Sequence, residues 1–249
     1  MPKAFLMTLS VLLICGSTLG AERPLRVFFV GNSYTYVNDL PGVLAALAEA
    51  SRDRRIVTGQ HTPGGYTLEQ HVKDGRAVED IQQQKWDVVV LQEQSVLPVV
   101  QPARMYAGAW KLHETIKSQE ARTLFYLTWA RKGQPQMQEG LHQAYFSLAK
   151  ALQADVAPVG TAWQWALRED PALELYMRDG SHPSPNGTYL AACVFYATLL
   201  DKNPVGLPAE VKKGGRTLLK IDPTLATWLQ GVAWRTVQDS KHAAPEKTP

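Results

Sequence analysis

The chain has 249 residues, which is enough for one α/β domain with a substantial hydrophobic core. Hydrophobic residues make up 45% of it and charged residues 20%, which is ordinary for a soluble globular protein. The formal net charge of +3 is small, so composition gives no reason to expect nucleic acid or an anionic membrane as the main partner.

Residues 1–21 have the pattern of a secretory signal peptide. Lys3 precedes an apolar run over residues 4–15, and small residues follow up to Gly20 and Ala21. The run is too short for a comfortable membrane span, so we expect cleavage near residue 21 and no stable membrane insertion afterwards. These features predict that the mature protein is secreted or periplasmic. The alternative is an N-terminal anchor that is not cleaved.

Strand-like and helix-like segments alternate after the predicted signal peptide. The strand-like segments are apolar runs, which we expect at residues 25–31, 56–61, 86–91, 123–129 and 155–159. The helix-like segments are longer, and we expect them at residues 40–52, 67–83, 103–118, 136–153, 161–168, 184–200 and 222–238. Residues 212–215 indicate a surface turn, and residues 240–249 have the composition of a disordered polar tail.

This alternation predicts βαβ units and a mainly parallel sheet. The strands are apolar throughout, as expected when helices cover both faces of the sheet. We find no internal repeat and no interdomain linker. The sequence therefore predicts a single domain over residues 22–239, with a three-layer α/β/α sandwich around a sheet of about five strands.

The cysteines and histidines do not indicate a metal site. Cys15 lies inside the predicted signal peptide, so Cys193 is left unpaired in an apolar run, where we expect a buried and unreactive thiol. Four histidines have no i,i+4 pairing and no acidic partner at ligand spacing: His61, His71, His113 and His142. We expect no metal and no organic cofactor.

The residues that could carry chemistry follow the ends of the predicted strands. In chain order they are Ser33, Gly64 and Gly65, residues 92–95, Trp129, Asp179 and His182. In a parallel α/β sheet, the ligand crevice lies at the carboxyl ends of the strands. We therefore expect all of these residues at one edge of the sheet.

Ser33, Asp179 and His182 can supply a nucleophile, an orienting carboxylate and a base. A serine at the end of a buried strand stands at the rim of the sheet, where a substrate can reach it. Asp179 and His182 are close enough in sequence to fold back on one another in a single turn. The pattern predicts a Ser-His-Asp triad, which is recognised by the roles of its members rather than by their order in the chain.

The chain resembles the SGNH (GDSL-type) hydrolase superfamily, in a divergent exported bacterial branch. Residues 31–33 (Gly-Asn-Ser) stand where that family has Gly-Asp-Ser, and residues 179–182 (Asp-Gly-Ser-His) match its Asp-x-x-His block. Gly65 stands at the second block, whose glycine N–H helps to form the oxyanion hole. The resemblance implies a flavodoxin-like fold and a catalytic triad of Ser33, Asp179 and His182.

The third block departs from the family pattern. The family has Gly-x-Asn-Asp there, with the Asn side chain donating to the oxyanion, whereas residues 92–95 read Gln-Glu-Gln-Ser. Counting from the strand places Gln94 at the Asn position, with Gln92 as the alternative. A glutamine amide can donate the same hydrogen bond from a stem that is one methylene longer. The resemblance thus implies an oxyanion hole made by the N–H groups of Ser33 and Gly65 and by the Gln94 side chain.

The function implied by the resemblance is that of an exported serine esterase acting on small acyl groups, such as acetyl, on a small molecule or a glycan. Two alternatives stay open: a lysophospholipase- or thioesterase-like enzyme for longer acyl chains, and a non-catalytic carbohydrate-binding protein on the same fold. Trp129 could line the acyl or sugar pocket, or it could pack in the core. Gln92 is the second tentative substrate-binding residue.

Overall fold

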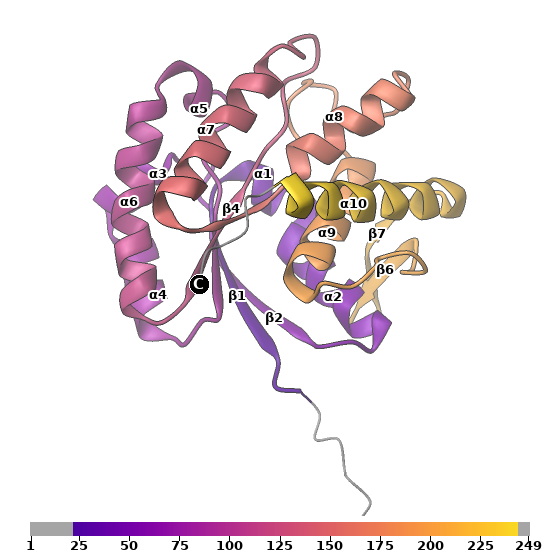
Figure 1. The fold of residues 1–249 in the computed structure, drawn as a ribbon. Coiled ribbons are helices and arrows are strands. Elements are labelled where there is room, and N and C mark those ends of the chain that lie inside the picture. The colour runs from indigo at the N-terminus through magenta and orange to yellow at the C-terminus, as the bar shows by residue number, and fades with distance from the viewer. Residues whose placement is uncertain (1–21, 244–249) are drawn as a thin grey trace, which may run out of the picture.

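The computed structural model describes residues 22–243 and contains a five-stranded sheet in the order β2-β1-β3-β4-β5. The strands are β1 (Leu25–Val30), β2 (Ile56–His61), β3 (Val88–Leu91), β4 (Arg122–Tyr126) and β5 (Asp155–Ala157). Every neighbouring pair is parallel, and helices lie on both sides of the sheet (Figure 1). The predicted three-layer α/β/α fold is confirmed. The predicted signal peptide lies outside the described residues.

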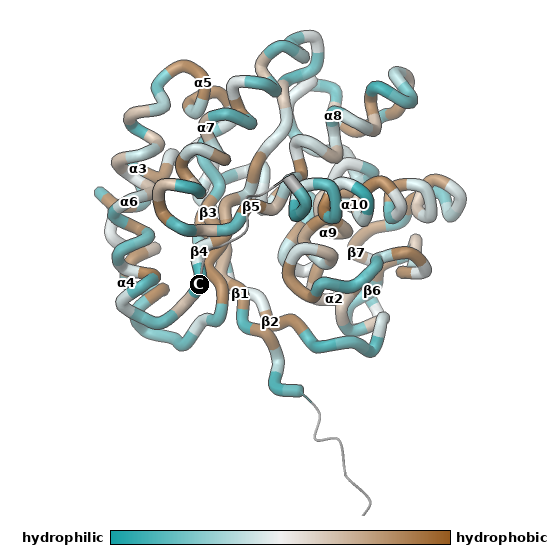
Figure 2. The backbone as a smooth tube through the Cα atoms, in the orientation of Figure 1, coloured by the Kyte–Doolittle hydropathy of each residue, from teal (hydrophilic) through white to brown (hydrophobic). Residues whose placement is uncertain are grey.

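The central strands are buried on both faces because their side chains enter two separate hydrophobic clusters. Val27 and Phe29 of β1 belong to one cluster, whereas Phe28 and Val30 belong to the other. Figure 2 shows hydrophobic segments along the strands, inside the helical layers. Burial on both faces explains why these strands are apolar throughout instead of alternating with polar residues.

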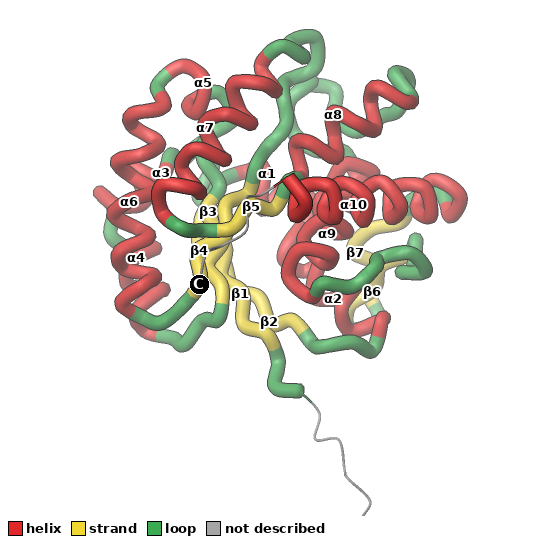
Figure 3. Tube along the Cα trace, viewed as in Figure 1, coloured by secondary structure: helices red, strands yellow, loops and turns green. Residues whose placement is uncertain are grey.

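Two layers of helices cover the sheet (Figure 3). One face is covered by α2 (Leu40–Ser51), α8 (Val159–Glu169), α9 (Pro185–Leu200) and α10 (Pro223–Ala243). The other face is covered by α3 (Leu68–Asp74), α4 (Arg76–Gln83), α6 (Pro102–Ser118) and α7 (Met137–Leu152). Cys193 is buried in α9, as predicted, and its burial raises the pKa of the thiol well above the usual range. Within residues 22–243, no helix is both long enough and apolar enough to cross a membrane.

Three segments differ from the sequence predictions. The helix expected over residues 67–83 is divided into α3 and α4, because Gly75 adopts a left-handed conformation with φ of 82° that ends the first helix. The turn predicted at residues 212–215 connects two short antiparallel strands that we did not predict, β6 (Glu210–Lys213) and β7 (Arg216–Lys220). The last helix continues to Ala243, so the segment expected to be a tail from residue 240 begins as helix.

Candidate active site

Ser33 is the first residue of a short helix, α1 (Ser33–Tyr36), that begins just beyond β1. The Asn32 side chain caps this helix by accepting a hydrogen bond from the Tyr34 N–H at 3.1 Å. Gly31 has no room for a side chain, because a Cβ there would lie 2.5 Å from Gln92 Oε1. The sharp turn from strand to helix therefore requires a glycine, and it places Ser33 at the carboxyl edge of the sheet.

The structure brings Ser33, His182 and Asp179 together in one chain of hydrogen bonds. Ser33 Oγ lies 2.8 Å from His182 Nε2, and His182 Nδ1 lies 2.5 Å from Asp179 Oδ2. Because a carboxylate only accepts, Nδ1 carries the proton, which leaves Nε2 free to accept the hydroxyl proton of Ser33. This is the tautomer that a general base needs.

Asp179 is held as a carboxylate by the turn that contains it. Its Oδ1 accepts hydrogen bonds from the N–H groups of Ser181 at 2.9 Å and His182 at 3.0 Å. The hydrogen bond from the His182 side chain and these backbone donors lower the pKa of Asp179 to about 2. Gly180 has a φ of 66°, so the turn uses the left-handed conformation that glycine adopts readily.

Side chains that follow Ser33 hold this turn in place. The Tyr34 hydroxyl lies 2.6 Å from Ser181 Oγ, and its ring packs edge-on against His182 with centroids 5.6 Å apart. Asn38 Nδ2 donates to the carbonyl of Pro183 at 2.9 Å. The segment that carries Ser33 is therefore bonded directly to the segment that carries His182.

Trp129 supports the same turn from inside the core. Its indole N–H donates to the Ser181 carbonyl at 3.0 Å, and its ring stacks between Tyr34 and Trp163, with centroid distances of 4.8 and 3.9 Å. The side chain is fully buried. The substrate-binding role expected for Trp129 does not fit this burial, and of our two expectations the structure matches packing in the core.

Gln92 is also buried and has its polar atoms occupied. Its Oε1 accepts from the Asn32 N–H at 2.8 Å and from Thr35 Oγ1 at 3.0 Å, and its Nε2 donates to Asn32 Oδ1 and to the Glu93 carbonyl. The tentative assignment of Gln92 to substrate binding is therefore corrected. Gln92 stabilises the turn before Ser33 instead.

Gln94 lies in the loop after β3, beside the start of helix α5 (Leu97–Val100). Its Oε1 accepts from the N–H groups of Val96 at 3.0 Å and Leu97 at 3.1 Å, and its Nε2 lies 3.4 Å from Ser95 Oγ. The carbonyl end of the amide thus caps a helix. The amide nitrogen is the end that remains able to donate to a ligand.

Gly65 lies in the loop between β2, the strand that pairs with β1, and α3. It has a φ of 74°, and an added Cβ would meet nothing within 4 Å. The glycine is therefore required by its backbone conformation and not by crowding. Asn32 Nδ2 donates to the carbonyl of the next residue, Tyr66, at 2.9 Å, which ties this loop to the turn before Ser33.

Two buried titratable residues support these loops. Glu93 accepts from the N–H groups of Gln94 at 2.6 Å and Leu68 at 3.2 Å, and its burial raises the pKa of the carboxyl to about 7. His71 Nε2 lies 2.8 Å from the Gly31 carbonyl, and burial lowers the pKa of the imidazole to about 4. Sequence reasoning missed the contact of His71, because its spacing along the chain carries no signal of the tertiary contact.

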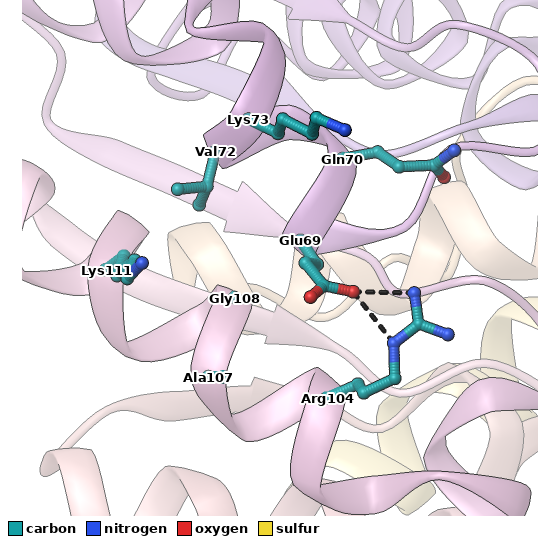
Figure 4. Close-up of a pocket in the computed structure, with 8 residues that line it drawn as sticks. All are labelled: Glu69, Gln70, Val72, Lys73, Arg104, Ala107, Gly108 and Lys111. Carbon is teal, nitrogen blue, oxygen red and sulfur yellow. Dashed lines mark hydrogen bonds and ion pairs between the residues drawn. The ribbon is translucent and has the colours of Figure 1, made fainter.

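A surface groove of 640 Å³ lies between α3 and α6 (Figure 4). Its polar lining includes Glu69 and Arg104, which are joined by an ion pair of 2.6 Å. None of the predicted site residues lines it. Among residues 22–243, no group of three or more His, Cys, Asp or Glu side chains is arranged to hold a metal ion.

No protein-family model matches the sequence, and no curated protein matches it either. Solved structures do match. A candidate SGNH hydrolase from Slackia heliotrinireducens is 28% identical, with a TM-score of 0.62, and the match covers 71% of this chain and 100% of that one. A DUF4886 family protein from Bacteroides uniformis is 23% identical, with a TM-score of 0.73 and coverage of 87% and 95%.

Acetyl esterases also share the fold. An acetyl-xylooligosaccharide esterase from a Geobacillus species is 15% identical, with a TM-score of 0.57, and the match covers 70% of this chain and 93% of that one. The sheet order, the position of residues 31–33 and 179–182 at one edge, and these structural relatives lead to the same conclusion. The chain has the fold of the SGNH hydrolases, with a sequence that diverges from theirs.

Proposed function

We propose that the protein is a serine esterase in which Ser33, His182 and Asp179 form the catalytic triad. The observation that carries this proposal is the continuous hydrogen-bond chain, with 2.8 Å from Ser33 Oγ to His182 Nε2 and 2.5 Å from His182 Nδ1 to Asp179 Oδ2. A nucleophile, its base and the group that orients the base are thus within reach of one another. The family and its esterase members support hydrolysis of an ester bond.

In the proposed reaction, His182 Nε2 takes the hydroxyl proton of Ser33 while Oγ bonds to the ester carbonyl carbon. The bond to the alcohol oxygen then breaks, and His182 gives its proton to the departing alcohol. Water attacks the acyl-enzyme, its proton moves to His182, and that proton returns to Ser33 Oγ as the acid leaves. Asp179 keeps the proton on Nδ1 and stabilises the imidazolium in both halves of the reaction.

The negative charge of the tetrahedral intermediate needs donors at fixed positions. We propose the N–H groups of Ser33 and Gly65 and Nε2 of Gln94. The Gly65 N–H has no hydrogen-bond partner among residues 22–243, and the Gln94 carbonyl oxygen is occupied by the cap of α5. Loss of one such donor typically lowers kcat by about 10²–10³.

We propose a small acyl group, such as acetyl, on a carbohydrate as the substrate of this exported enzyme. Two structural relatives are an acetyl-xylooligosaccharide esterase and an acetyl xylan esterase, which supports this class. Tyr36 lies in the same short helix as Ser33 and is 45% exposed. An exposed aromatic ring beside the nucleophile gives a flat apolar surface of the kind on which a sugar ring can stack.

A preference for longer acyl chains is the second candidate. A lipase/acylhydrolase from Enterococcus faecalis has the same fold, with 15% identity and a TM-score of 0.56. Hydrolysis of p-nitrophenyl acetate, butyrate and octanoate separates the two candidates by chain length. Ser33→Ala is the matched control, and labelling by a fluorophosphonate reports a reactive serine without depending on the substrate.

We expect activity on the acetate ester that disappears in Ser33→Ala. A preference for octanoate would move the assignment to the longer acyl chains. A folded wild-type protein with neither activity nor labelling would refute the triad, and it would favour a carbohydrate-binding protein without catalysis.

A further inference from the structure

Arg131 lies between two of the loops that form the candidate active site. It follows β4 by a few residues, on the same edge of the sheet as Ser33. Its Nη2 donates to Ser95 Oγ at 2.9 Å, next to Gln94. The N–H of the following residue, Lys132, donates to the Gly180 carbonyl at 2.8 Å, inside the turn that holds Asp179 and His182. The guanidinium thus contacts the neighbour of the proposed oxyanion donor, and the backbone beside it is bonded to the turn that holds the proposed base.

The charge of Arg131 has no counter-charge among residues 22–243. The side chain is partly buried, its Nε is removed from solvent without a hydrogen bond, and no ion pair joins it to a carboxylate of residues 22–243. The two carboxylates near the site are engaged elsewhere, since Asp179 bonds to His182 and Glu93 bonds to the backbone of Leu68 and Gln94. A partly buried cation is normally paired, because desolvation of an unpaired charge is costly.

The neighbouring cations strengthen the positive potential at this edge. Lys132 and Arg178 are exposed on either side of Gly180, and neither forms an ion pair within the described part of the chain. Arginine presents a planar fork of N–H donors that matches a carboxylate, which lysine cannot do. The Nε of Arg131 is buried and its Nη2 donates to Ser95, so Nη1, which has no hydrogen bond among residues 22–243, is the part of that fork open to a ligand.

We propose that Arg131 binds a carboxylate of the substrate, so that the enzyme prefers esters whose acyl or alcohol part carries a carboxylate group. The inference rests on the proposed esterase function, because it assigns the substrate class of that same site. It narrows the substrate from any acyl ester to an anionic one. On a carbohydrate, the group would be the carboxylate of an acidic sugar next to the ester.

The test compares esters in which a single carboxylate replaces an uncharged group. For the acyl part, we compare 4-nitrophenyl hydrogen glutarate with 4-nitrophenyl valerate. For the alcohol part, we compare an O-acetylated methyl galacturonoside with the corresponding methyl galactoside. We expect the wild type to prefer the charged ester in one of the two pairs, and Arg131→Gln to lower that preference about 10- to 100-fold in kcat/KM, as expected for a charge-assisted hydrogen bond.

Two further variants distinguish binding of the carboxylate by the Arg131 guanidinium from a general effect of positive charge at this edge. Lys132→Gln removes a neighbouring exposed charge but no proposed contact with the carboxylate, and we expect it to lower the preference far less than Arg131→Gln does. Arg131→Lys keeps the charge but not the fork, and we expect only part of the preference to remain. An equal loss on charged and neutral esters in Arg131→Gln, or the absence of any preference in the wild type, would overturn the proposal.

A binding measurement separates this proposal from the proposed function. Calorimetry of methyl galacturonoside and of glutarate with the Ser33→Ala protein does not require catalysis. We expect one of them to bind and Arg131→Gln, in the same background, to weaken the binding at least tenfold. Binding without any ester hydrolysis by the wild type would support Arg131 and refute the esterase. Hydrolysis of neutral esters without binding of either carboxylate would support the esterase and refute the role of Arg131.

Discussion

Glu93 and His71 make opposite contributions to the pH dependence of stability, and single substitutions should reveal each one. Burial raises the pKa of Glu93 from 4.5 to about 7, chiefly because the charged carboxylate loses solvent. Burial lowers the pKa of His71 from 6.5 to about 4, because the charged imidazolium loses solvent. Between about pH 4 and pH 7, each of these groups therefore has a different protonation state in the folded protein than in the unfolded chain.

The two groups change the free energy of unfolding in opposite directions as the pH falls. As the pH falls from 7 to 4.5, the unfolded chain protonates His71 while the folded protein does not, so the free energy of unfolding decreases. Over the same range the folded protein protonates Glu93 while the unfolded chain does not, so the free energy of unfolding increases. Each tenfold change in proton affinity corresponds to about 1.4 kcal/mol, which gives about 3 kcal/mol for each group with opposite signs.

The assay is urea unfolding of three proteins at pH 7 and pH 4.5. In the wild type, we expect the contributions of Glu93 and His71 to the pH dependence of the free energy of unfolding to cancel. In Glu93→Gln the His71 effect is no longer compensated, so stability should fall by about 3 kcal/mol more than in the wild type on acidification. In His71→Gln, whose amide can still donate to the Gly31 carbonyl, stability should rise with acid relative to the wild type by a similar amount. Equal pH slopes in all three proteins would refute the assignment of these titrations.

Other substitutions test the site directly. Asp179→Asn should lower kcat by about 10⁴ by favouring the wrong tautomer of His182, measured with p-nitrophenyl acetate, and an effect below tenfold would contradict the role of Asp179. Gln94→Glu keeps an oxygen to cap α5 but removes the amide donor, so kcat should fall at least 10²-fold while the melting temperature changes little. Tyr36→Ala should raise KM for acetylated oligosaccharides several-fold more than for p-nitrophenyl acetate, and equal effects on both would remove Tyr36 from sugar binding.

The strands and the two short segments around Ser33 and His182 could be predicted because their signals are local. An apolar run followed by Gly-Asn-Ser indicates β1 and the turn after it, and a short Asp-to-His spacing indicates a second turn, independently of the rest of the chain. The alternation of strands and helices implies that Ser33 lies at the carboxyl edge of a parallel sheet, but its contact with His182 depends on how the turn before α9 packs on α1.

The roles of Trp129 and Gln92 could not be predicted in this way, because they depend on distant neighbours. β4 ends at Tyr126, so the chain has already left the sheet at Trp129, whose ring turns inward between Tyr34 and Trp163. Gln92 comes directly after β3, but its amide is used by the turn before Ser33. A polar or aromatic residue at a strand end can face the crevice or the core, and only the tertiary contacts decide between them.

Ser33 and His182 are 149 residues apart in the sequence, since Ser33 follows β1, the first strand of the chain, and His182 comes after β5, the last strand of the large sheet. Neither half of the chain holds a complete reactive centre, so a partly synthesised or unfolded chain carries only an ordinary serine. Chemical reactivity should appear in the last stage of folding, when the turn before α9 docks on the segment after β1. Reactivity of Ser33 would then be a sensitive reporter of the fully assembled domain, lost on a single backbone cut that separates the two segments.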